Sequence, residues 1–311
     1  MIPNTKLMIP KLPTKFKNCN VIPLTNALTN QVYKLEIQGG NGKEYYLLRV
    51  FGSLLSRKYE NRLLKYISQN GHPVDIVYSE KTYRIESWIN HKEVFPYEIP
   101  ILSTQIASKL GWYHSLCPPI EKTNVILDGL YEMANEINYK LPFSYLNSIK
   151  NHELVLGHND LQYGNILKTD NGIVFIDFEY SGYVPRYYDI ANHFCEFMAD
   201  YASDSPELLK YSKFPSLQLR ESFYSSYLSS LSSYSADSDS ANEESSSLLE
   251  FDQQVGFYSL LSHLYWGVWG LYKSKSMDEK RSFDYNLYGS KRLERFHELL
   301  ALEKGEGNIS I

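Results

Sequence analysis

The fold is decided by two neighbouring segments, LGHNDLQYGN at residues 156–165 and VFIDFE at residues 174–179. They hold three acid or amide side chains at short spacing: Asp160, then Asn165 five residues later, then Asp177 a further twelve residues along. The apolar residues of the second segment predict a short strand that carries Asp177 to the other two side chains. A structural loop with coincidental polar residues is the alternative, and three positions in register make it the weaker interpretation.

Such a set of side chains suits phosphoryl transfer. In that chemistry one carboxylate orients the acceptor hydroxyl and takes its proton, while an amide and a second carboxylate hold Mg²⁺ against the nucleotide phosphates. The spacing H-x-D-x-x-x-x-N, with an aspartate after the following strand, is similar to the arrangement in protein kinases. We therefore expect a site for ATP and Mg²⁺, with His158 holding the loop in place rather than reacting.

The composition is that of an ordinary globular protein. A chain of 311 residues suffices for about two domains or lobes. Hydrophobic residues make up 43% and charged residues 22%, which is typical of soluble domains. The net charge of −5 and the lack of any lysine/arginine cluster argue against a nucleic-acid partner.

Several features together predict a cytoplasmic protein. No apolar run approaches the ~20 residues of a membrane span, and residues 1–17 lack the apolar centre of a signal peptide. Cys19, Cys117 and Cys195 are far apart and lack metal-ligand spacing, so we expect free thiols in a reducing compartment.

The first part of the chain predicts a small nucleotide-binding lobe at residues 18–95, which follows a flexible arm at residues 1–17. Period-two alternation and a Gly-rich turn at residues 39–42 are typical of β-hairpins. The expected elements are strands at residues 31–37, 45–51, 76–79 and 82–88 and a helix at residues 56–68.

Residues 96–311 predict a large lobe that is mainly helical. Within it, residues 229–247 are dominated by Ser, Asp and Glu and predict a low-complexity insertion. The predicted fold class is therefore α+β and protein-kinase-like, with an antiparallel sheet and one helix in the small lobe. The expected helices lie at residues 101–116, 187–197, 217–231 and 248–302, the last broken at residues 274–281.

The small lobe should supply a cation for the nucleotide phosphates. Arg49 is the candidate, because it lies inside an otherwise apolar strand, and Glu60 on the next helix is its expected partner. Without further evidence, an arginine that faces solvent from an edge strand would be the favoured interpretation of Arg49. The motif at residues 156–165 favours the phosphate-binding role instead. The Gly-x-Gly-x-x-Gly pattern is absent, and residues 24–30 (LTNALTN) stand in its place.

Matching segments extend beyond the loop and give a family resemblance. Together they resemble the choline/ethanolamine kinases, in family order from about residue 24 to residue 296. The segments are HNDLQYGNIL (158–167), FIDFEYSGY (175–183), YDIANHFCE (188–196), LLRVFG (47–52), RIESWI (84–89), SHLYWGVW (262–269) and FDYNLY (283–288).

The resemblance implies ATP-dependent phosphorylation of an amino alcohol, the first step towards phosphatidylcholine or phosphatidylethanolamine. It implies that Asp160 is the base facing the substrate hydroxyl, and that Asn165 and Asp177 are the Mg²⁺ ligands. Gln162 lies beside them and is expected to touch phosphate or metal. Asp189 and His193 are expected to brace the loop from below without touching a ligand.

The resemblance also implies the ATP-binding segments of the small lobe. Glu86, Ser87 and Trp88 correspond to the link between lobes, where backbone groups meet adenine. Asn30 fits the end of the family's phosphate loop, but Asn26 and Ala27 replace the usual glycines. That departure bears on loop flexibility and ATP affinity, not on the reaction class.

A quaternary ammonium cannot donate a hydrogen bond, so aromatic faces and nearby negative charge must hold it. Trp266 and Trp269 share one helix face, and Gly267 and Gly270 keep that helix narrow enough for close approach by another element. Core packing is the usual role of aromatic pairs at this spacing. Here the residues fall where the resembled family builds its choline box, which implies Tyr180, Tyr201, Trp266, Trp269, Tyr285 and Tyr288, with Glu196 as the carboxylate.

Choline is the favoured substrate, because the two tryptophans suit a methylated cation and residues 192–196 look like the choline members. Ethanolamine is the first alternative. Another small-molecule kinase of aminoglycoside type would more often line its pocket with acids, and a choline-binding pseudokinase scaffold is supported only by the missing glycines. A Ser/Thr protein kinase is disfavoured because no Ala-Pro-Glu segment follows Asp177. A homodimer is expected by family analogy alone.

Overall fold

The computed structural model describes residues 9–24, 31–40, 42–51, 57–149, 152–234, 248–276 and 283–305. Its contacts divide the chain into two compact units, residues 1–92 and 93–311. The division falls three residues before the predicted one. Each unit is described by itself below.

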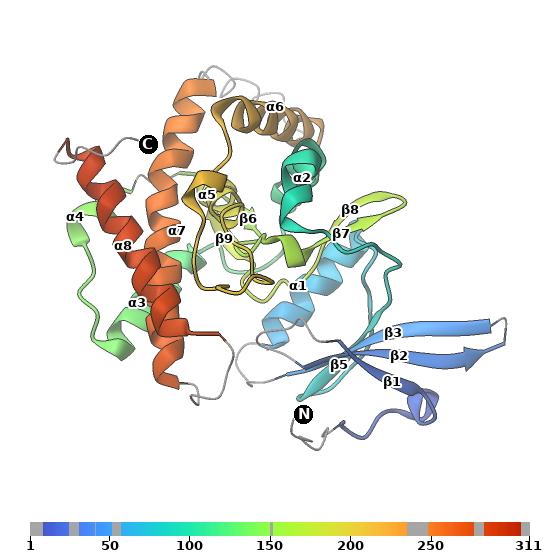
Figure 1. Cartoon of the computed structure of the whole chain (residues 1–311). Coiled ribbons are helices and arrows are strands. Elements are labelled where there is room, and N and C mark those ends of the chain that lie inside the picture. The colour runs from blue at the N-terminus through green and yellow to red at the C-terminus, as the bar shows by residue number, and fades with distance from the viewer. Residues whose placement is uncertain are drawn as a thin grey trace. The chain divides into compact units, whose positions relative to one another are not determined.

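The first unit is built on a five-stranded antiparallel sheet with the order β1-β2-β3-β5-β4 (Figure 1). Alternation along the strands puts one set of side chains into a common core, where Tyr33 and Leu35 pack with Leu48 and Ile85. The strands are β1 (Asn20–Leu24), β2 (Gln31–Gly39), β3 (Gly42–Val50), β4 (Ile76–Ser79) and β5 (Tyr83–Ser87).

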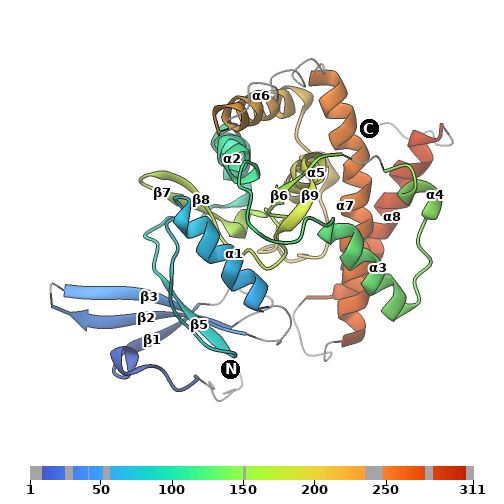
Figure 2. The ribbon, with the colours of Figure 1, turned by 180° about the vertical axis from the view of Figure 1, so that it is seen from behind.

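One helix, α1 (Arg57–Gln69), lies beside this sheet (Figure 2). Its Leu63, Leu64 and Ile67 are fully buried and form the apolar stripe that docks the helix. Glu60 lies in the first turn, where the helix dipole favours a negative charge.

The prediction of a flexible arm at residues 1–17 is wrong for its last residues. A 3₁₀ turn, η1 (Thr14–Phe16), places Phe16 in the sheet core, where its side chain is 2% exposed and meets the Tyr46 ring edge-on at 5.1 Å. Strand β1 was also missed. Pro23 interrupts its strand pattern, and β1 tolerates this proline because it is an edge strand.

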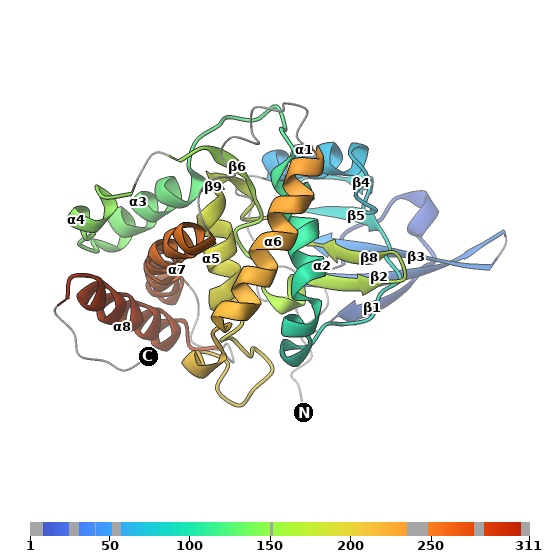
Figure 3. The same ribbon diagram turned by 90° about the horizontal axis from the view of Figure 1, so that it is seen from above.

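The second unit is mainly helical, as predicted. Helices α2 and α6 lie side by side, as do α7 and α8 (Figure 3). Helix α3 was not predicted from the sequence. Its N-terminal signal is Asn124, whose side chain accepts from the Ile126 and Leu127 N–H groups. The helices are α2 (Ile99–His114), α3 (Val125–Ile137), α4 (Phe143–Leu146), α5 (Arg186–Glu196), α6 (Leu217–Tyr234), α7 (Leu248–Ser276) and α8 (Tyr285–Glu303).

Short elements lie between these helices. Strand β6 (Leu154–Gly157) pairs with β9 (Gly182–Pro185), and β7 (Ile166–Thr169) pairs with β8 (Gly172–Phe175), both antiparallel. The described residues of this unit also form three 3₁₀ turns: η2 (Pro96–Glu98), η3 (Tyr163–Asn165) and η4 (Tyr211–Lys213). In the part of the chain that the structure describes, no helix is long and apolar enough to cross a membrane.

Close packing of α7 on α8 depends on glycine, as predicted for Gly267 and Gly270. A Cβ atom at Gly270 would lie 2.7 Å from the Gly289 Cα, and one at Gly267 would lie 2.7 Å from the Leu293 Cγ. No side chain fits at such distances without moving the helices apart. The narrow face therefore fixes the positions of the aromatic residues on both helices.

The predicted low-complexity insertion begins later than expected. Helix α6 continues through Tyr234, so residues 229–234 are helical, and residues 235–247 lie outside the described ranges. Ser230 helps to explain the longer helix, because its hydroxyl donates to the Ser108 carbonyl of α2 at 2.7 Å. Composition alone cannot show this packing contact.

Candidate active site

The loop at residues 156–165 is held from the α5 side. The carboxylate of Asp189 accepts from the His158 and Asn159 backbone N–H groups at 2.7 Å each. The Nδ1 of His193 donates to the Leu161 carbonyl at 2.8 Å. Both contacts agree with the bracing role predicted for Asp189 and His193.

His158 joins the two halves of the motif. Its Nε2 donates to the Ile176 carbonyl at 2.9 Å, and its Nδ1 accepts from the Asp160 N–H at 3.4 Å. Burial lowers the pKa of His158, which keeps the ring neutral with one donor and one acceptor nitrogen. These contacts fit the structural role predicted for this residue.

Two residues of the site have left-handed backbone conformations. Asn159 has a φ of 67° and Asp177 a φ of 66°. Asn and Asp adopt this region more readily than other residues with a Cβ atom. The amide of Asn159 also donates to the Tyr180 carbonyl at 2.9 Å, so the turn that carries Asp177 and the loop that carries Asp160 are tied together.

Asp160 and Asn165 are in direct contact. The Asn165 Nδ2 donates to the main-chain oxygen of Asp160 at 2.7 Å and to its Oδ2 at 2.9 Å. The Ile176 N–H donates to the Asn165 carbonyl at 3.0 Å, which brings the residue before Asp177 to the same place.

Negative charge accumulates around Asp160. Burial raises the pKa of its carboxyl well above the ordinary value, and the nearby carboxylates of Glu196, Asp177 and Glu179 raise it further. These four residues form what we call the acidic group. Such an arrangement favours the binding of cations, because a cation relieves the repulsion among the carboxylates.

Five of the predicted box residues form one aromatic cluster. The rings of Trp266 and Trp269 are 5.1 Å apart between centroids, and Tyr180 meets Trp266 at 5.1 Å. Tyr285 and Tyr288 meet Trp269 at 5.5 Å and 6.2 Å. We call Tyr180, Trp266, Trp269, Tyr285 and Tyr288 the aromatic cluster.

The aromatic cluster is linked to the loop that carries Asp160. Burial raises the pKa values of Tyr180 and Tyr288, and the Asp160 carboxylate contributes to both increases. Asn192 provides a mechanical link as well. Its Oδ1 accepts from the Trp266 indole at 2.7 Å, and its Nδ2 donates to the Asn159 carbonyl at 3.0 Å.

Glu196 and Tyr201 lie at the edge of the cluster. The Tyr201 hydroxyl donates to the Glu196 Oε2 at 2.7 Å, and the Arg292 guanidinium donates to the Oε1 at 2.8 Å. Tyr201 also stacks on Tyr163 of the loop, with centroids 6.0 Å apart. Arg292 also donates to the Tyr288 hydroxyl at 3.1 Å, so hydrogen bonds link Glu196 and Tyr201 to the aromatic cluster.

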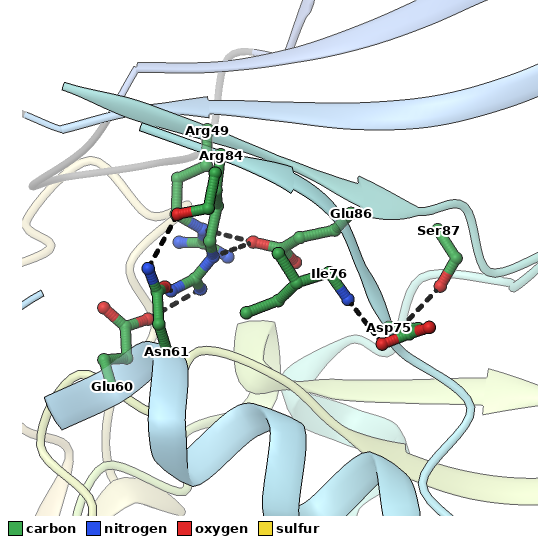
Figure 4. Close-up of polar contacts among 9 residues, drawn as sticks. Arg49, Glu60, Asn61, Asp75, Ile76, Arg84, Glu86 and Ser87 are labelled. Atoms are coloured by element: carbon green, nitrogen blue, oxygen red, sulfur yellow. Dashed lines mark hydrogen bonds and ion pairs between the residues drawn. The ribbon is translucent and has the colours of Figure 1, made fainter. Parts of the chain in front are cut away.

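In the first unit, Arg49 belongs to a buried charge network (Figure 4). Its Nε donates to the Glu86 Oε1 at 3.2 Å, and Arg84 donates to the same oxygen at 2.6 Å. Arg84 also pairs with Glu60 at 2.6 Å. Arg49 and Glu60, expected to be partners, are thus joined through Glu86 and Arg84.

The remaining ATP-binding candidates of this unit have structural contacts. The Ser87 hydroxyl accepts from the Asp75 N–H at 2.8 Å (Figure 4), and the Lys34 ammonium lies 4.5 Å from the Trp88 ring centroid. Asn30 lies outside the described residues. Their proposed contacts with ATP stay predictions.

Comparison with known proteins identifies the family. The sequence model described as choline/ethanolamine kinase matches residues 124–297, which is more than half of the chain. The chain belongs to the choline/ethanolamine kinase family. The probable choline kinase 3 of Arabidopsis thaliana is 31% identical over 315 residues, covering 90% of this chain and 86% of the relative.

Solved structures show the same fold. A choline kinase from Cryptosporidium parvum has a TM-score of 0.74 at 22% identity, covering 95% of this kinase and 93% of the other chain. An ethanolamine kinase from Plasmodium vivax has a TM-score of 0.69 at 21% identity, covering 92% and 84%. The predicted kinase-like α+β fold is confirmed.

Two arginines that pair with candidate site residues were not predicted from the sequence. Arg292 and Arg84 are each 1% exposed, and each neutralises a carboxylate far away in the sequence. Arg292 follows Tyr288 by four residues, so it shares a helix face with that box residue. That four-residue spacing is the sequence signal from which Arg292 could have been predicted. Arg84, like Arg49, is a charged residue inside a strand.

Gln162 has a local role in the structure. Its side-chain oxygen accepts from the Gly164 N–H at 2.7 Å and so caps η3. Asn165 is the last residue of this turn. The predicted contact of Gln162 with phosphate or metal stays a prediction.

Proposed function

We propose that this kinase transfers a phosphoryl group from ATP to the hydroxyl of choline, giving phosphocholine and ADP with Mg²⁺ as the metal. One observation carries the proposal: hydrogen bonds through Asn192 and Asn159 tie Trp266 and Tyr180 of the aromatic cluster to the loop that carries Asp160. A site that holds a cation by aromatic faces beside a proton acceptor suits an alcohol that carries a quaternary ammonium.

In this proposal Asp160 accepts the proton of the substrate hydroxyl. Its raised pKa supports the role, because a carboxylate with a higher pKa is the stronger base. Asn165 donates its amide N–H to Asp160, so its side-chain oxygen is the atom that suits Mg²⁺. Asp177 supplies the second metal ligand and Gln162 a contact to phosphate or metal.

The aromatic cluster and Tyr201 hold the trimethylammonium group, and Glu196 supplies negative charge. Both indole N–H groups are already satisfied, by Asn192 at 2.7 Å and by the Tyr180 hydroxyl at 3.0 Å. The indole N–H groups therefore need no hydrogen-bond acceptor on the substrate. They can act through their faces, as a quaternary ammonium requires.

In the first unit we assign ATP contacts to Arg49, held by Glu86, and to the segment around Ser87 and Trp88. The buried network keeps the guanidinium charged and fixed, which a phosphate ligand requires. The other assigned residues are Asn30 in the phosphate loop and Glu60, which pairs with Arg84.

Ethanolamine is the alternative substrate, because the family includes ethanolamine kinases and Glu196 could accept from a primary ammonium. By family analogy, we further assign the enzyme to the cytoplasm, as a homodimer, at the first step towards phosphatidylcholine.

The test is ADP release with choline, ethanolamine, their N-methylated intermediates and an aminoglycoside, with Asp160→Ala as the blank. We expect the highest kcat/KM with choline. A higher value with ethanolamine would reverse the substrate assignment, and turnover of the aminoglycoside alone would replace it. Thermal stabilisation by choline but not by Mg·ATP would indicate a non-catalytic scaffold.

A further inference from the structure

Both oxygens of Glu196 are occupied by protein donors. The Arg292 Nη2 donates to Oε1 at 2.8 Å, and the Tyr201 hydroxyl donates to Oε2 at 2.7 Å. The Glu196 side chain is buried, and Arg292 is 1% exposed. The carboxylate is therefore fixed in position by one donor on each oxygen.

Arg292 is in turn fixed by its own neighbours. Its Nε donates to the Tyr288 hydroxyl at 3.1 Å, and its Nη1 lies 3.5 Å from the His263 Nδ1. Burial lowers the pKa of His263 well below the ordinary value, and the Arg292 charge lowers it further, so this ring is neutral. The guanidinium is thus the cation that balances Glu196 here, and it also holds a member of the aromatic cluster.

The two candidate substrates differ in what they require from Glu196. A primary ammonium carries three N–H donors, and each needs an acceptor when the group leaves water. A trimethylammonium carries none and interacts through its charge alone. Protein donors on both oxygens leave fewer lone pairs of Glu196 for a primary ammonium, whereas a trimethylammonium needs none of them.

We propose that Arg292 is a specificity-determining positioning residue: together with Tyr201 it occupies one acceptor site on each oxygen of Glu196 and so biases the site towards a quaternary ammonium. The inference rests on the proposed function, because it concerns the choice between the two amino alcohols. Arg292 acts through Glu196 and Tyr288, and does not touch the reacting atoms.

The experiment measures kcat/KM for choline and for ethanolamine on the same preparation of each variant. The ratio of the two values is independent of the fraction of correctly folded enzyme. Arg292→Met removes the guanidinium and Arg292→Lys keeps the charge with fewer donors. Tyr201→Phe keeps the ring and removes only the hydroxyl donor.

We expect the choline-to-ethanolamine ratio to fall about 10-fold in Arg292→Met, the size of one additional hydrogen bond to a charged group. Tyr201→Phe should also lower the choline-to-ethanolamine ratio. Arg292→Lys should give a ratio between those of Arg292→Met and the wild type. The matched control is Arg220→Met, since Arg220 pairs with Asp252 through two bonds at 2.7 Å and 2.9 Å between α6 and α7. Its ratio should equal that of the wild type.

An unchanged or increased ratio in Tyr201→Phe and in Arg292→Met overturns the inference. If Arg292→Met fails to fold, the ratio in Tyr201→Phe decides alone. A wild-type enzyme that phosphorylates neither amino alcohol would instead overturn the proposed function. The two failures are therefore distinguishable.

Discussion

At the scale of single residues, the proposed role of Asp160 as proton acceptor is accompanied by a cost in stability. Burial and three neighbouring carboxylates raise its pKa, so the ionised form is unfavourable in the ligand-free protein. A raised folded-state pKa contributes stability that is complete below the ordinary pKa and is lost as the pH rises through the folded-state pKa. At neutral pH the Asp160 carboxylate is therefore destabilising.

Asp160→Asn should lose activity and gain stability. We expect kcat to fall about 10²- to 10⁴-fold, as for loss of a general base, while Tm at pH 7.5 rises above that of the wild type. Thermal unfolding and ADP release measured on the same preparation check both effects. Asp170→Asn, on the exposed turn between β7 and β8, is the control. Equal Tm values for Asp160→Asn and wild type would contradict the account.

At the scale of elements, α5 positions the loop by buried contacts from a single helix face. Asp189, Asn192 and His193 each bond to the loop backbone. Burial lowers the pKa of His193 to about 4. The unfolded chain therefore binds a proton that the folded protein excludes, and the stability that this histidine contributes is lost as the pH falls from about 6.5 towards 4.

His193→Asn tests this linkage, because the amide can still donate to the Leu161 carbonyl but does not titrate. Between pH 7.5 and pH 5 the wild type should lose on the order of 2 kcal/mol more unfolding free energy than the variant. Urea unfolding at both pH values measures the difference. Parallel pH dependence in the two proteins would show that His193 is protonated in the folded state.

At the scale of the whole molecule, local spacing predicted helices α1, α2 and α5 to α8, strands β2 to β5 and the core of the candidate site, but not α3 or α4. The Asp160–Asn165 contact spans only five residues, so the motif shows it directly. Strand β1 was hidden by Pro23, because the sequence does not show which strand lies at an edge.

Partners far apart in the sequence were not predictable. Arg292 meets Glu196 across 96 positions, and Arg84 meets Glu60 across 24. Such pairs depend on how helices and strands pack, which periodicity does not encode. The aromatic cluster was predicted only because the resemblance supplied its members. Ring spacing alone fits core packing equally well.

The central claim is that the aromatic cluster binds the ammonium group of the substrate, and Trp269→Leu tests it. Trp269 is the better choice of the two tryptophans, because Trp266 also bonds to Asn192, which holds the loop. Trp112→Leu is the control, a half-buried tryptophan on α2.

The decisive measurement is kcat/KM for choline in wild type, Trp269→Leu and Trp112→Leu. The account predicts a loss of about 30-fold or more in Trp269→Leu, since a desolvated cation–π contact contributes ~2 kcal/mol, and wild-type activity in Trp112→Leu. A value for Trp269→Leu within twofold of wild type would contradict it.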